Sequence, residues 1–327
     1  MMRAAHLVAH GRPPELVQAT APTRSTGQAV VAVTAAPITP LDVLCATGTS
    51  YFGAPELPYV PGVQGVGTVI EASHLTAGTR VWFPSSAGMT AGDGSLAELA
   101  LATEAELVPL PDGVPDEVVA GLGLSAIAAW MSLTWRARLQ PGEDALVLGA
   151  GGVVGQVAVQ VARILGARRV VAAARSADSR ERAISYAADD VVELRAGDDM
   201  AGLAARLEQA CGGQVSVVID PLCGVPGSAA AEVLAEGGRL VNLGSSAGPS
   251  AEYTSATLRS RSAAILGYTN NSLTNEQRRD ALTSLLRHAA EGNLTVDHET
   301  VEWDDLPDAW ARQADGQARR RIVVRIS

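Results

Sequence analysis

A chain of 327 residues is long enough to form two domains, each with a sizeable buried core. Its apolar content of 47% argues against disorder, and its formal charge of -10 argues against nucleic-acid binding as the main role. No uninterrupted apolar run is long enough to span a bilayer, and the N-terminus carries no signal-peptide core, so we expect no membrane role.

The cysteines and the basic residues narrow the chemistry further. Cys45, Cys211 and Cys223 are too widely spaced for a disulfide framework or a metal quartet, which makes a reducing cytoplasm the expected compartment. The chain has no lysine, so all 25 basic residues are arginine. This excludes a Tyr-x-x-x-Lys short-chain dehydrogenase site, a Schiff-base lysine and a phosphate-loop lysine.

The order of predicted elements indicates two kinds of structure along the chain. Residues 1–120 are strand-rich and punctuated by proline and glycine, with strands expected at 29–35, 67–72 and 80–83. Residues 121–267 alternate between strands and helices, which predicts a doubly wound parallel sheet with helices on both faces. Strands are expected there at 145–148, 170–174, 190–193, 215–219, 239–243 and 263–267, and helices at 154–165, 179–188, 200–211 and 228–234.

The tail returns to mixed structure. It contains expected helices at 275–291 and 306–313, an extended stretch at 298–303 and a basic final strand at 320–326. We therefore expect an α/β protein in which residues 1–120, with 268–327 returning to them, form one domain. Residues 121–267 form the second.

The most informative segment is a buried strand that enters a glycine-rich turn and then a helix. Its glycines are spaced Gly149-x-x-Gly152-x-x-Gly155, and together with Val153 and Val154 they are the candidate cofactor-binding residues of this segment. Glycine permits positive φ in a tight turn, and its lack of a side chain lets a pyrophosphate reach backbone N–H groups at the helix N-terminus. An ordinary strand-to-helix turn is the alternative, because the spacing is not a strict G-x-G-x-x-G. The following strand completes a βαβ unit, which favours dinucleotide binding.

The residues after the second strand of this unit indicate which dinucleotide binds. A site specific for NAD needs a carboxylate about 20 residues beyond the glycine turn, where it binds the ribose 2′-hydroxyl. This chain has Arg175 and Ser176 there, with Arg180 just beyond. A guanidinium and a hydroxyl bind a 2′-phosphate through charge-assisted hydrogen bonds, so we expect NADPH. Solvated surface arginines are the alternative, since Asp178 and Glu181 lie nearby.

Six segments carry a family resemblance when they are taken in order. They are Thr39-Pro-Leu-Asp42, Leu57-Pro-Tyr-Val-Pro-Gly-Val-Gln-Gly65, Gly78-Thr-Arg-Val81, the glycine turn, Val218-Ile-Asp-Pro-Leu-Cys-Gly224 and Gly237-Gly-Arg-Leu-Val-Asn-Leu-Gly244. At these separations the chain resembles zinc-independent members of the medium-chain dehydrogenase/reductase superfamily, closest to the quinone oxidoreductase group. The resemblance implies a GroES-like substrate domain, a Rossmann domain, an active site in the cleft between them and hydride transfer from a nicotinamide. It also implies a homodimer, with strand 263–267 as a candidate edge.

Departures from the zinc-bearing branch indicate a zinc-free enzyme. Those relatives carry a Cys-x-x-Asp-like segment where this chain has Thr39-Pro-Leu-Asp42, and Gly-His-Glu where it has Gly62-Val-Gln64. A catalytic zinc therefore lacks its thiolate and imidazole ligands, and the cysteine quartet of a structural zinc lobe is missing too. The histidines fall outside the motif segments and are expected to be surface or packing residues: His6, His10, His74, His288 and His298.

The resemblance also nominates residues near the substrate. Tyr51 stands where the family has a tyrosine near the nicotinamide, and a phenol there orients or protonates a carbonyl oxygen. A loop tyrosine with one packed face is the equal alternative. Thr39 stands where many relatives have an asparagine, and its hydroxyl keeps a hydrogen-bonding group at that place. Asp42 is equally well explained as a helix-capping carboxylate.

Other residues are expected beside the cofactor. Ser125 matches a hydroxyl that lies near the cofactor in relatives, and a helix-start hydroxyl is the competing account. Cys223 is expected to be a buried, inert thiol, because no adjacent basic residue lowers its pKa. Residues at the carboxyl ends of two strands are expected at the nicotinamide half of the cofactor: Asp220, Pro221, Asn242, Leu243 and Gly244.

These features predict an NADPH-dependent reductase that transfers hydride to a small quinone or α,β-unsaturated carbonyl. One alternative is an enoyl or alkenal reductase of a biosynthetic pathway, in which hydride goes to the β-carbon and a proton to the α-carbon. Another is a catalytically idle NADPH-binding sensor or structural protein. Retention of Tyr51, Asp220 and Asn242 on the nicotinamide side argues against the idle alternative.

Overall fold

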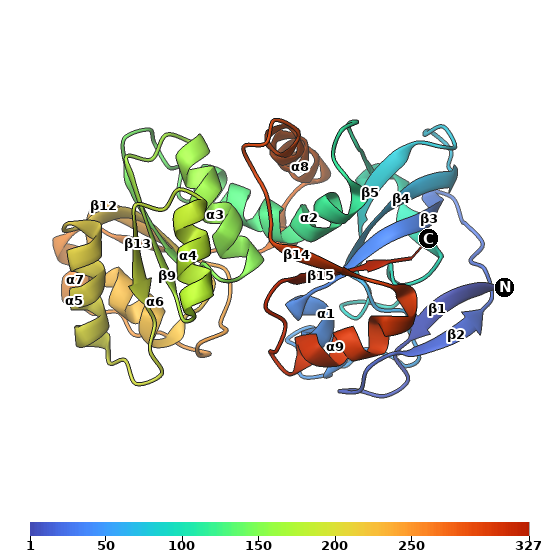
Figure 1. The fold of residues 1–327 in the computed structure, drawn as a ribbon, viewed down its shortest axis with the longest axis horizontal. Coiled ribbons are helices and arrows are strands. Elements are labelled where there is room, and N and C mark those ends of the chain that lie inside the picture. Colours follow the sequence, from blue (N-terminus) through green and yellow to red (C-terminus); the bar gives the residue numbers. More distant parts are fainter. Residues whose placement is uncertain (327) are drawn as a thin grey trace. The chain divides into compact units, whose positions relative to one another are not determined.

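The computed structural model describes residues 1–326, which form two compact units (Figure 1). Unit 1 comprises Met1–Leu124, Asn275–Ala290 and the chain from Val296 onward. Unit 2 comprises Ser125–Thr274 and Glu291–Thr295. The sequence predicts one domain of residues 1–120 with 268–327 and a second of residues 121–267. These domain limits remain a prediction.

Unit 1 is built on a seven-stranded sheet with the order β14-β15-β3-β4-β5-β7, and β6 also pairs with β3. A separate hairpin pairs β1 with β2 in antiparallel register. The strands are β1 (Met2–His6), β2 (Glu15–Ala19), β3 (Gln28–Ile38), β4 (Gln64–Glu71), β5 (Arg80–Pro84), β6 (Leu99–Thr103), β7 (Val108–Pro109), β14 (His298–Val301) and β15 (Arg321–Arg325). The helices are α1 (Pro40–Ala46), α8 (Asn275–Ala290) and α9 (Leu306–Ala314).

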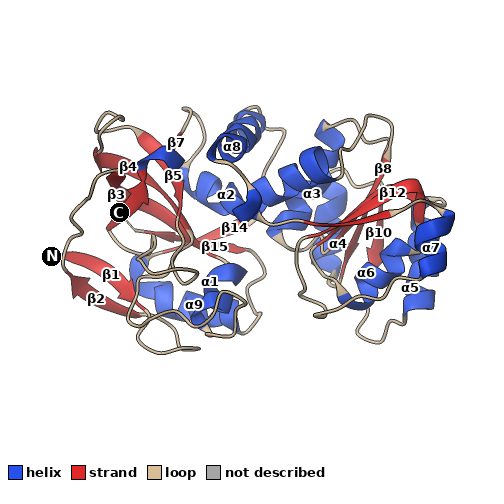
Figure 2. Cartoon of the chain, turned by 180° about the vertical axis from the view of Figure 1, so that it is seen from behind, coloured by secondary structure: helices blue, strands red, loops and turns tan. Residues whose placement is uncertain are grey.

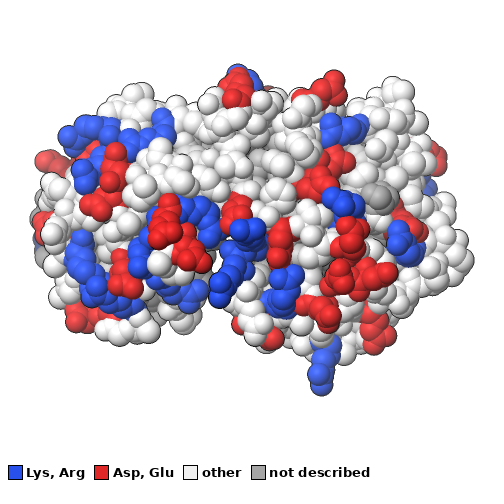
Figure 3. All heavy atoms as spheres, viewed as in Figure 1, with Lys and Arg blue, Asp and Glu red and all other residues white. Residues whose placement is uncertain are grey.

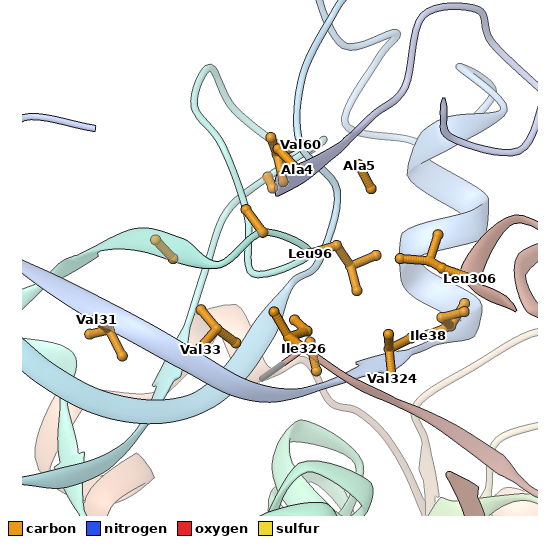
Figure 4. Packing of buried hydrophobic residues seen from close by; sticks show 14 of the residues in the cluster. Ala4, Ala5, Val31, Val33, Ile38, Val60, Leu96, Leu306, Val324 and Ile326 are labelled. Carbon is orange, nitrogen blue, oxygen red and sulfur yellow. The ribbon is translucent and has the colours of Figure 1, made fainter. Parts of the chain in front are cut away.

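The core of unit 1 is filled by small and β-branched side chains. Val31, Val33 and Ile38 point from β3 toward Leu96 and toward Val324 and Ile326 near the C-terminus (Figure 4). The tail therefore completes the same core as the first strands, because β15 pairs with β3 in antiparallel register. Burying such side chains is the main stabilising term for a domain of this kind.

Unit 2 contains a six-stranded sheet with the order β10-β9-β8-β11-β12-β13, and each neighbouring pair is parallel. The strands are β8 (Asp144–Leu148), β9 (Arg169–Ala174), β10 (Asp190–Glu193), β11 (Val215–Asp220), β12 (Leu234–Asn242) and β13 (Ala264–Gly267). The helices are α3 (Val153–Ile164), α4 (Ala177–Ser185), α5 (Met200–Cys211), α6 (Gly224–Ala231) and α7 (Ser255–Ser260). Helices lie on both sides of the sheet (Figure 2). The predicted doubly wound parallel sheet is confirmed.

One expected helix has different bounds in the structure, and one helix was not predicted. The helix expected at 228–234 is α6, which starts and ends earlier, and Leu234 begins β12. The carboxylate of Asp220 accepts hydrogen bonds from the N–H groups of Leu222 and Cys223. These hydrogen bonds stabilise a tight turn directly after β11, so the helix begins as early as Gly224.

Helix α2 (Asp116–Met131) was not predicted, because it is apolar on all sides and shows no helical periodicity. Its backbone leaves the helical region at Gly123, where φ is 33° and ψ is -132°. A Cβ atom at Gly123 would overlap Oε1 of Gln64, so the side chain of Gln64 occupies the space. Segment Asp116–Arg136 is long and apolar enough to cross a membrane by length and composition, but 67% of its apolar window is buried within the protein. A core helix has these properties too.

Charged side chains are interspersed on the visible face of the molecule. Figure 3 shows arginine and acidic side chains side by side over that face, without a single continuous basic field. Ion pairs join many arginine and acidic side chains of the described residues, such as Arg206 and Asp198 at 2.7 Å.

Candidate functional site

The glycine turn between β8 and α3 uses its three glycines for three different reasons. Gly149 has a φ of +64° and makes the turn. A Cβ atom at Gly155 would overlap the carbonyl oxygen of Gly149 and lie 2.6 Å from Cα of Ala150, so this glycine lets the helix pack against the strand. Gly152 is exposed, and the nearest atom to a Cβ there is 3.7 Å away.

The first turn of α3 is suited to an anion. Gly152 is its N-cap residue, and no side chain caps the helix. The N–H groups of the first turn therefore keep donors for a ligand, and the helix dipole adds positive potential at the same place. Val153 is buried and Val154 is half-buried, so packing of these side chains fixes the start of the helix.

The turns that follow β8, β11 and β12 lie side by side. A Cβ atom at Gly149 would lie 3.1 Å from Cγ of Pro221 and 3.0 Å from Cδ2 of Leu222. A Cβ atom at Gly244 would lie 2.6 Å from the carbonyl oxygen of Pro221. The structure thus brings the predicted residues of three separate motifs to one carboxyl edge of the sheet, which is where parallel α/β sheets bind ligands.

Asp220 and Asn242 fix that edge. Asp220 is fully buried, and its Oδ1 accepts hydrogen bonds from the N–H groups of Leu222 at 2.9 Å and Cys223 at 2.8 Å. Asn242 donates from Nδ2 to Oδ2 of Asp220 at 3.0 Å and to the carbonyl oxygen of Gly244 at 3.0 Å. Burial raises the pKa of Asp220, and these donors oppose that shift. Both side chains are thus engaged in holding the turns.

The other residues expected beside the cofactor are partly accessible. Leu243 is half-buried, and its N–H donates to the carbonyl oxygen of Asp220 at 3.0 Å. Ser125 is half-buried and lies in α2, two residues after the break at Gly123. It therefore stands near the start of the second helical stretch, as the competing account expected.

The three residues expected at a 2′-phosphate differ in availability. Arg175 is exposed, and within residues 1–326 no hydrogen bond or ion pair engages its guanidinium. Ser176 caps α4: its Oγ accepts from the N–H of Ser179 at 3.2 Å. Arg180 donates to the carbonyl oxygen of Arg175 at 2.6 Å and lies 3.6 Å from the carboxylate of Glu193. Arg175 is thus the freest of the three.

In unit 1, Thr39 and Asp42 form a capping box at the start of α1. The hydroxyl of Thr39 donates to Oδ2 of Asp42 at 2.6 Å and accepts from the N–H of Asp42 at 3.2 Å. Oδ2 of Asp42 also accepts from the N–H of Thr39 at 2.8 Å, and Oδ1 accepts from the N–H of Val63 at 2.8 Å. The interpretation of Asp42 as a capping carboxylate is confirmed, and the Thr39 hydroxyl is engaged locally.

The two tyrosines of unit 1 have opposite environments. Tyr51 lies in a loop with 80% of its surface exposed, and its ring centroid is 4.1 Å from that of Phe52. Tyr59 is only 6% exposed, and burial raises its pKa above the usual value. Sequence reasoning did not single out Tyr59, because it lies inside a proline- and glycine-rich motif that gives no sign of where its side chain points.

The residues present do not fit a zinc ion. Among residues 1–326, no group of three His, Cys, Asp or Glu side chains is placed to hold a metal. Oε1 of Gln64 accepts hydrogen bonds from Nε1 of Trp82 at 3.0 Å and from the N–H of Leu124 at 2.7 Å. These two donors fix the amide orientation, so the remaining end is an NH₂ group, which cannot ligate a cation.

Comparisons with known proteins agree with this architecture. A family model described as an alcohol dehydrogenase GroES-like domain matches residues 25–112, and one described as a zinc-binding dehydrogenase matches residues 153–287. A phenolphthiocerol/phthiocerol polyketide synthase chain of Mycobacterium tuberculosis is 32% identical over 91% of this protein. The match spans only 14% of that synthase chain's length. The quinone oxidoreductase of Mus musculus is 28% identical over 85% of the chain and 83% of its own length.

Solved structures of similar fold cover nearly the whole chain. The quinone oxidoreductase from Thermus thermophilus, also solved in complex with NADPH, has a TM-score of 0.82 at 27% identity and covers 99% of this chain and 100% of its own. A mycobacterial quinone oxidoreductase has a TM-score of 0.88 at 22% identity, with the same coverage, which shows a shared fold. With both units matched, this chain belongs to the medium-chain dehydrogenase/reductase superfamily, in its quinone oxidoreductase-like group.

Proposed function

We propose that this protein is a zinc-independent reductase that transfers hydride from NADPH to a quinone or an α,β-unsaturated carbonyl. The observation that carries the proposal is the uncapped, glycine-lined N-terminus of α3 followed, one strand later, by the free guanidinium of Arg175. The first feature suits a pyrophosphate, and the second suits a 2′-phosphate. The solved NADPH complex of the Thermus thermophilus relative supports the same cofactor.

The chain's own residues divide the binding of NADPH among them. The backbone at Gly149, Gly152 and Gly155 receives the pyrophosphate, with Val153 and Val154 holding the helix start. Arg175 binds the 2′-phosphate, Ser176 orients the following helix, and Arg180 braces the turn through the Arg175 carbonyl. The remaining proposed contacts face the nicotinamide half: Ser125, Asp220, Pro221, Asn242, Leu243 and Gly244. When bound, NADPH supplies the hydride, and the protein orients the reactants and excludes water.

Without a metal, hydrogen bonds have to polarise the acceptor. Tyr51 remains a proposed donor, because its exposed phenol is free to reach a ligand. Thr39 is proposed to act through the start of α1, since its hydroxyl already donates to Asp42. The proton that completes the reduction comes from water or from a phenol of this kind.

An enoyl reductase of a biosynthetic pathway is the second candidate. The observation that favours it is the identity of several relatives as segments of polyketide synthases, at 30–34% identity over 67–91% of this chain. In that case the acceptor is an enoyl thioester, hydride goes to its β-carbon and a proton goes to its α-carbon. The chemistry at the nicotinamide is the same, so only the acceptor distinguishes the two candidates.

Deuterium transfer tests the proposal directly. NADPH labelled on the reactive face of the nicotinamide is supplied with a quinone, an enone or an enoyl thioester, and the products are analysed by mass spectrometry and NMR. We expect label in the reduced product, on the β-carbon for the enone. Label found only in solvent rules out direct transfer. Tight NADPH binding without turnover of any acceptor favours the idle, cofactor-binding alternative.

We also propose a cytoplasmic homodimer. Strand β13 lies at the edge of the unit 2 sheet, and most of its side chains are half-buried rather than exposed. An edge with unpaired backbone groups is a ready surface for pairing with a second copy. Sedimentation equilibrium checks this, and a monomer at every concentration contradicts it.

A further inference from the structure

A pocket of about 240 Å³ opens on unit 1. Two loops form its walls, the first from Pro55 to Tyr59 and the second from Gly88 to Asp93. Pockets that hold drug-sized ligands span about 300–1,000 Å³, so this one suits a smaller molecule, of about one ring.

Tyr59 is one of the residues that line this pocket. Backbone hydrogen bonds with Leu7, at 2.8 and 3.3 Å, fix its position, and only 6% of the residue is exposed. A Cβ atom at Gly88 would lie 2.8 Å from the phenol oxygen, so the hydroxyl stands directly behind a glycine that lines the pocket. Within residues 1–326, no hydrogen bond reaches this hydroxyl. The oxygen is not one of the fully buried side-chain atoms that lack a partner, so it keeps contact with solvent and is able to donate a hydrogen bond to a molecule in the pocket.

The groups behind Tyr59 keep it protonated. Burial raises its pKa above the usual value, and the nearby carboxylate of Asp42 and thiol of Cys45 raise it further. The hydroxyl therefore remains a hydrogen-bond donor throughout the neutral pH range. A donor of this kind orients a carbonyl oxygen but does not readily give up its proton.

The charged side chains that line the pocket are carboxylates. Glu56 is exposed, and within residues 1–326 no ion pair engages it. Asp93 uses Oδ1 to accept from the N–H of Val60 at 2.8 Å. The described residues that line the pocket include these two carboxylates and no arginine or histidine. An anionic ligand would meet like charges at the entrance.

We propose that this pocket binds the carbonyl end of a small, uncharged, single-ring acceptor through a hydrogen bond from Tyr59, and that Glu56 and Asp93 select against anionic acceptors. The assignment rests on the proposed function, because it names the acceptor class. In this proposal Tyr59 binds the acceptor in the pocket, and Tyr51, on its exposed loop, does not supply this hydrogen bond.

Direct binding tests the phenol without any turnover. Cyclohexanone is titrated by ligand-observed NMR into the wild-type protein, Tyr59→Phe and the matched control Tyr186→Phe, which removes a phenol oxygen from unit 2. We expect the Kd to rise about fivefold in Tyr59→Phe, the value for one net hydrogen bond, and to stay at the wild-type value in the control. NADPH affinity and Tm, measured on the same samples, show that each variant is folded. Equal Kd values for wild type and a folded Tyr59→Phe overturn the proposal.

Charge selection is tested with two acceptors of the same shape. The KM of cyclohex-2-enone is compared with that of its 4-carboxylate in wild type, Glu56→Gln and the control Glu15→Gln, which neutralises an exposed carboxylate elsewhere on unit 1. We expect the wild-type KM to be lower for the neutral enone than for its carboxylate. The ratio of the two KM values should fall severalfold in Glu56→Gln and stay at the wild-type value in Glu15→Gln. An unchanged ratio in Glu56→Gln contradicts the role of that carboxylate. If neither enone is reduced, the proposed function fails for enones. The NMR titration still shows whether the pocket binds a ketone through Tyr59.

Discussion

The amide of Asn242 donates a hydrogen bond to the buried carboxylate of Asp220 at 3.0 Å, which ties the carboxyl ends of β11 and β12 together. The two residues are neighbours only because parallel pairing places Asp220 opposite Asn242. Their link holds Pro221 between Gly149 and Gly244, where three turns meet. The shape of the proposed cofactor site therefore depends on one partly buried side-chain contact.

Replacing Asn242 by Asp should destabilise the protein in a pH-dependent way. The change sets a second carboxylate, at a half-buried position, against the buried carboxylate of Asp220, at an expected cost of about 3 kcal/mol at neutral pH. Because burial already raises the pKa of Asp220, the pair is tolerated when protonated. A folded-state pKa above the unfolded value gives stability that is present at low pH and lost as pH rises through the folded-state pKa.

Urea unfolding at pH 5 and pH 8 measures this effect. The deficit of Asn242→Asp relative to wild type should be larger at pH 8. Asn271→Asp, at an exposed position of unit 2, serves as the control and should show little change at either pH. A deficit that is the same at both pH values contradicts the assignment.

Two glycines of the turn should respond differently to alanine. Gly155→Ala places a Cβ against the Gly149 carbonyl and should cost about 1–3 kcal/mol of stability, as overpacking does. Gly152→Ala adds its Cβ in open space, so the Tm should change little, because alanine is the poorer N-cap residue but restricts the unfolded chain more than glycine does. If the pyrophosphate approaches Gly152 closely, the Kd of NADPH should nevertheless rise at least about tenfold in Gly152→Ala. Thermal unfolding and NADPH fluorescence titration separate the two effects, and unaltered NADPH affinity in Gly152→Ala contradicts the placement.

Arg175→Ala combined with Ser176→Asp should reverse the preference for NADPH. The free guanidinium is lost and a carboxylate is placed where a 2′-phosphate would lie, so the KM for NADPH should rise about 10–100-fold. Aspartate caps a helix as well as serine does, so α4 should remain intact. NADH use should be unchanged or improved.

Initial rates with both nucleotides check this prediction. Arg287→Ala, which removes an exposed arginine from unit 1, should leave the KM for NADPH at its wild-type value. A wild-type enzyme that already prefers NADH shows that the interpretation of Arg175 is wrong.

The ion pair of Glu143 with Arg239 should stabilise unit 2 only above acidic pH. Two parallel hydrogen bonds, at 2.7 and 2.8 Å, join the groups, and the guanidinium lowers the pKa of Glu143. A lowered folded-state pKa gives stability that is present above the unfolded pKa and lost as pH falls through the folded value. Glu143→Gln should therefore cost about 1–2 kcal/mol at pH 7 and much less near pH 3.5 in urea unfolding. A deficit that grows toward acid contradicts the sign.

Exhaustive chelation should leave activity intact. The amide of Gln64 offers only its NH₂ group at the place where zinc-bearing relatives have a ligand segment, so no metal is expected to be bound there. Activity and metal content are measured before and after treatment with a chelator. Stoichiometric zinc that is lost together with activity would overturn zinc independence.

The sequence alone determined the features that depend on local pattern. Strand Val215–Asp220, helix Met200–Cys211 and the βαβ unit around Gly149 were predicted nearly to the residue, because apolar periodicity and glycine placement are local signals. Local signals also located Arg175 at the end of β9. The family and fold class followed from several such segments in order.

Tertiary structure decided what depends on residues far apart in the chain. The break of α2 at Gly123 exists because Gln64, from β4, fills the space, and no helical pattern contains that information. Asp220 is expected from the sequence to be a nicotinamide-side residue, yet its carboxylate is used by Asn242 and two backbone N–H groups. Tyr51 carries the family motif but is exposed, whereas Tyr59 is buried behind Gly88. Periodicity fixes which face of an element is apolar, but only packing brings distant side chains together and so decides which polar group is left free for a ligand.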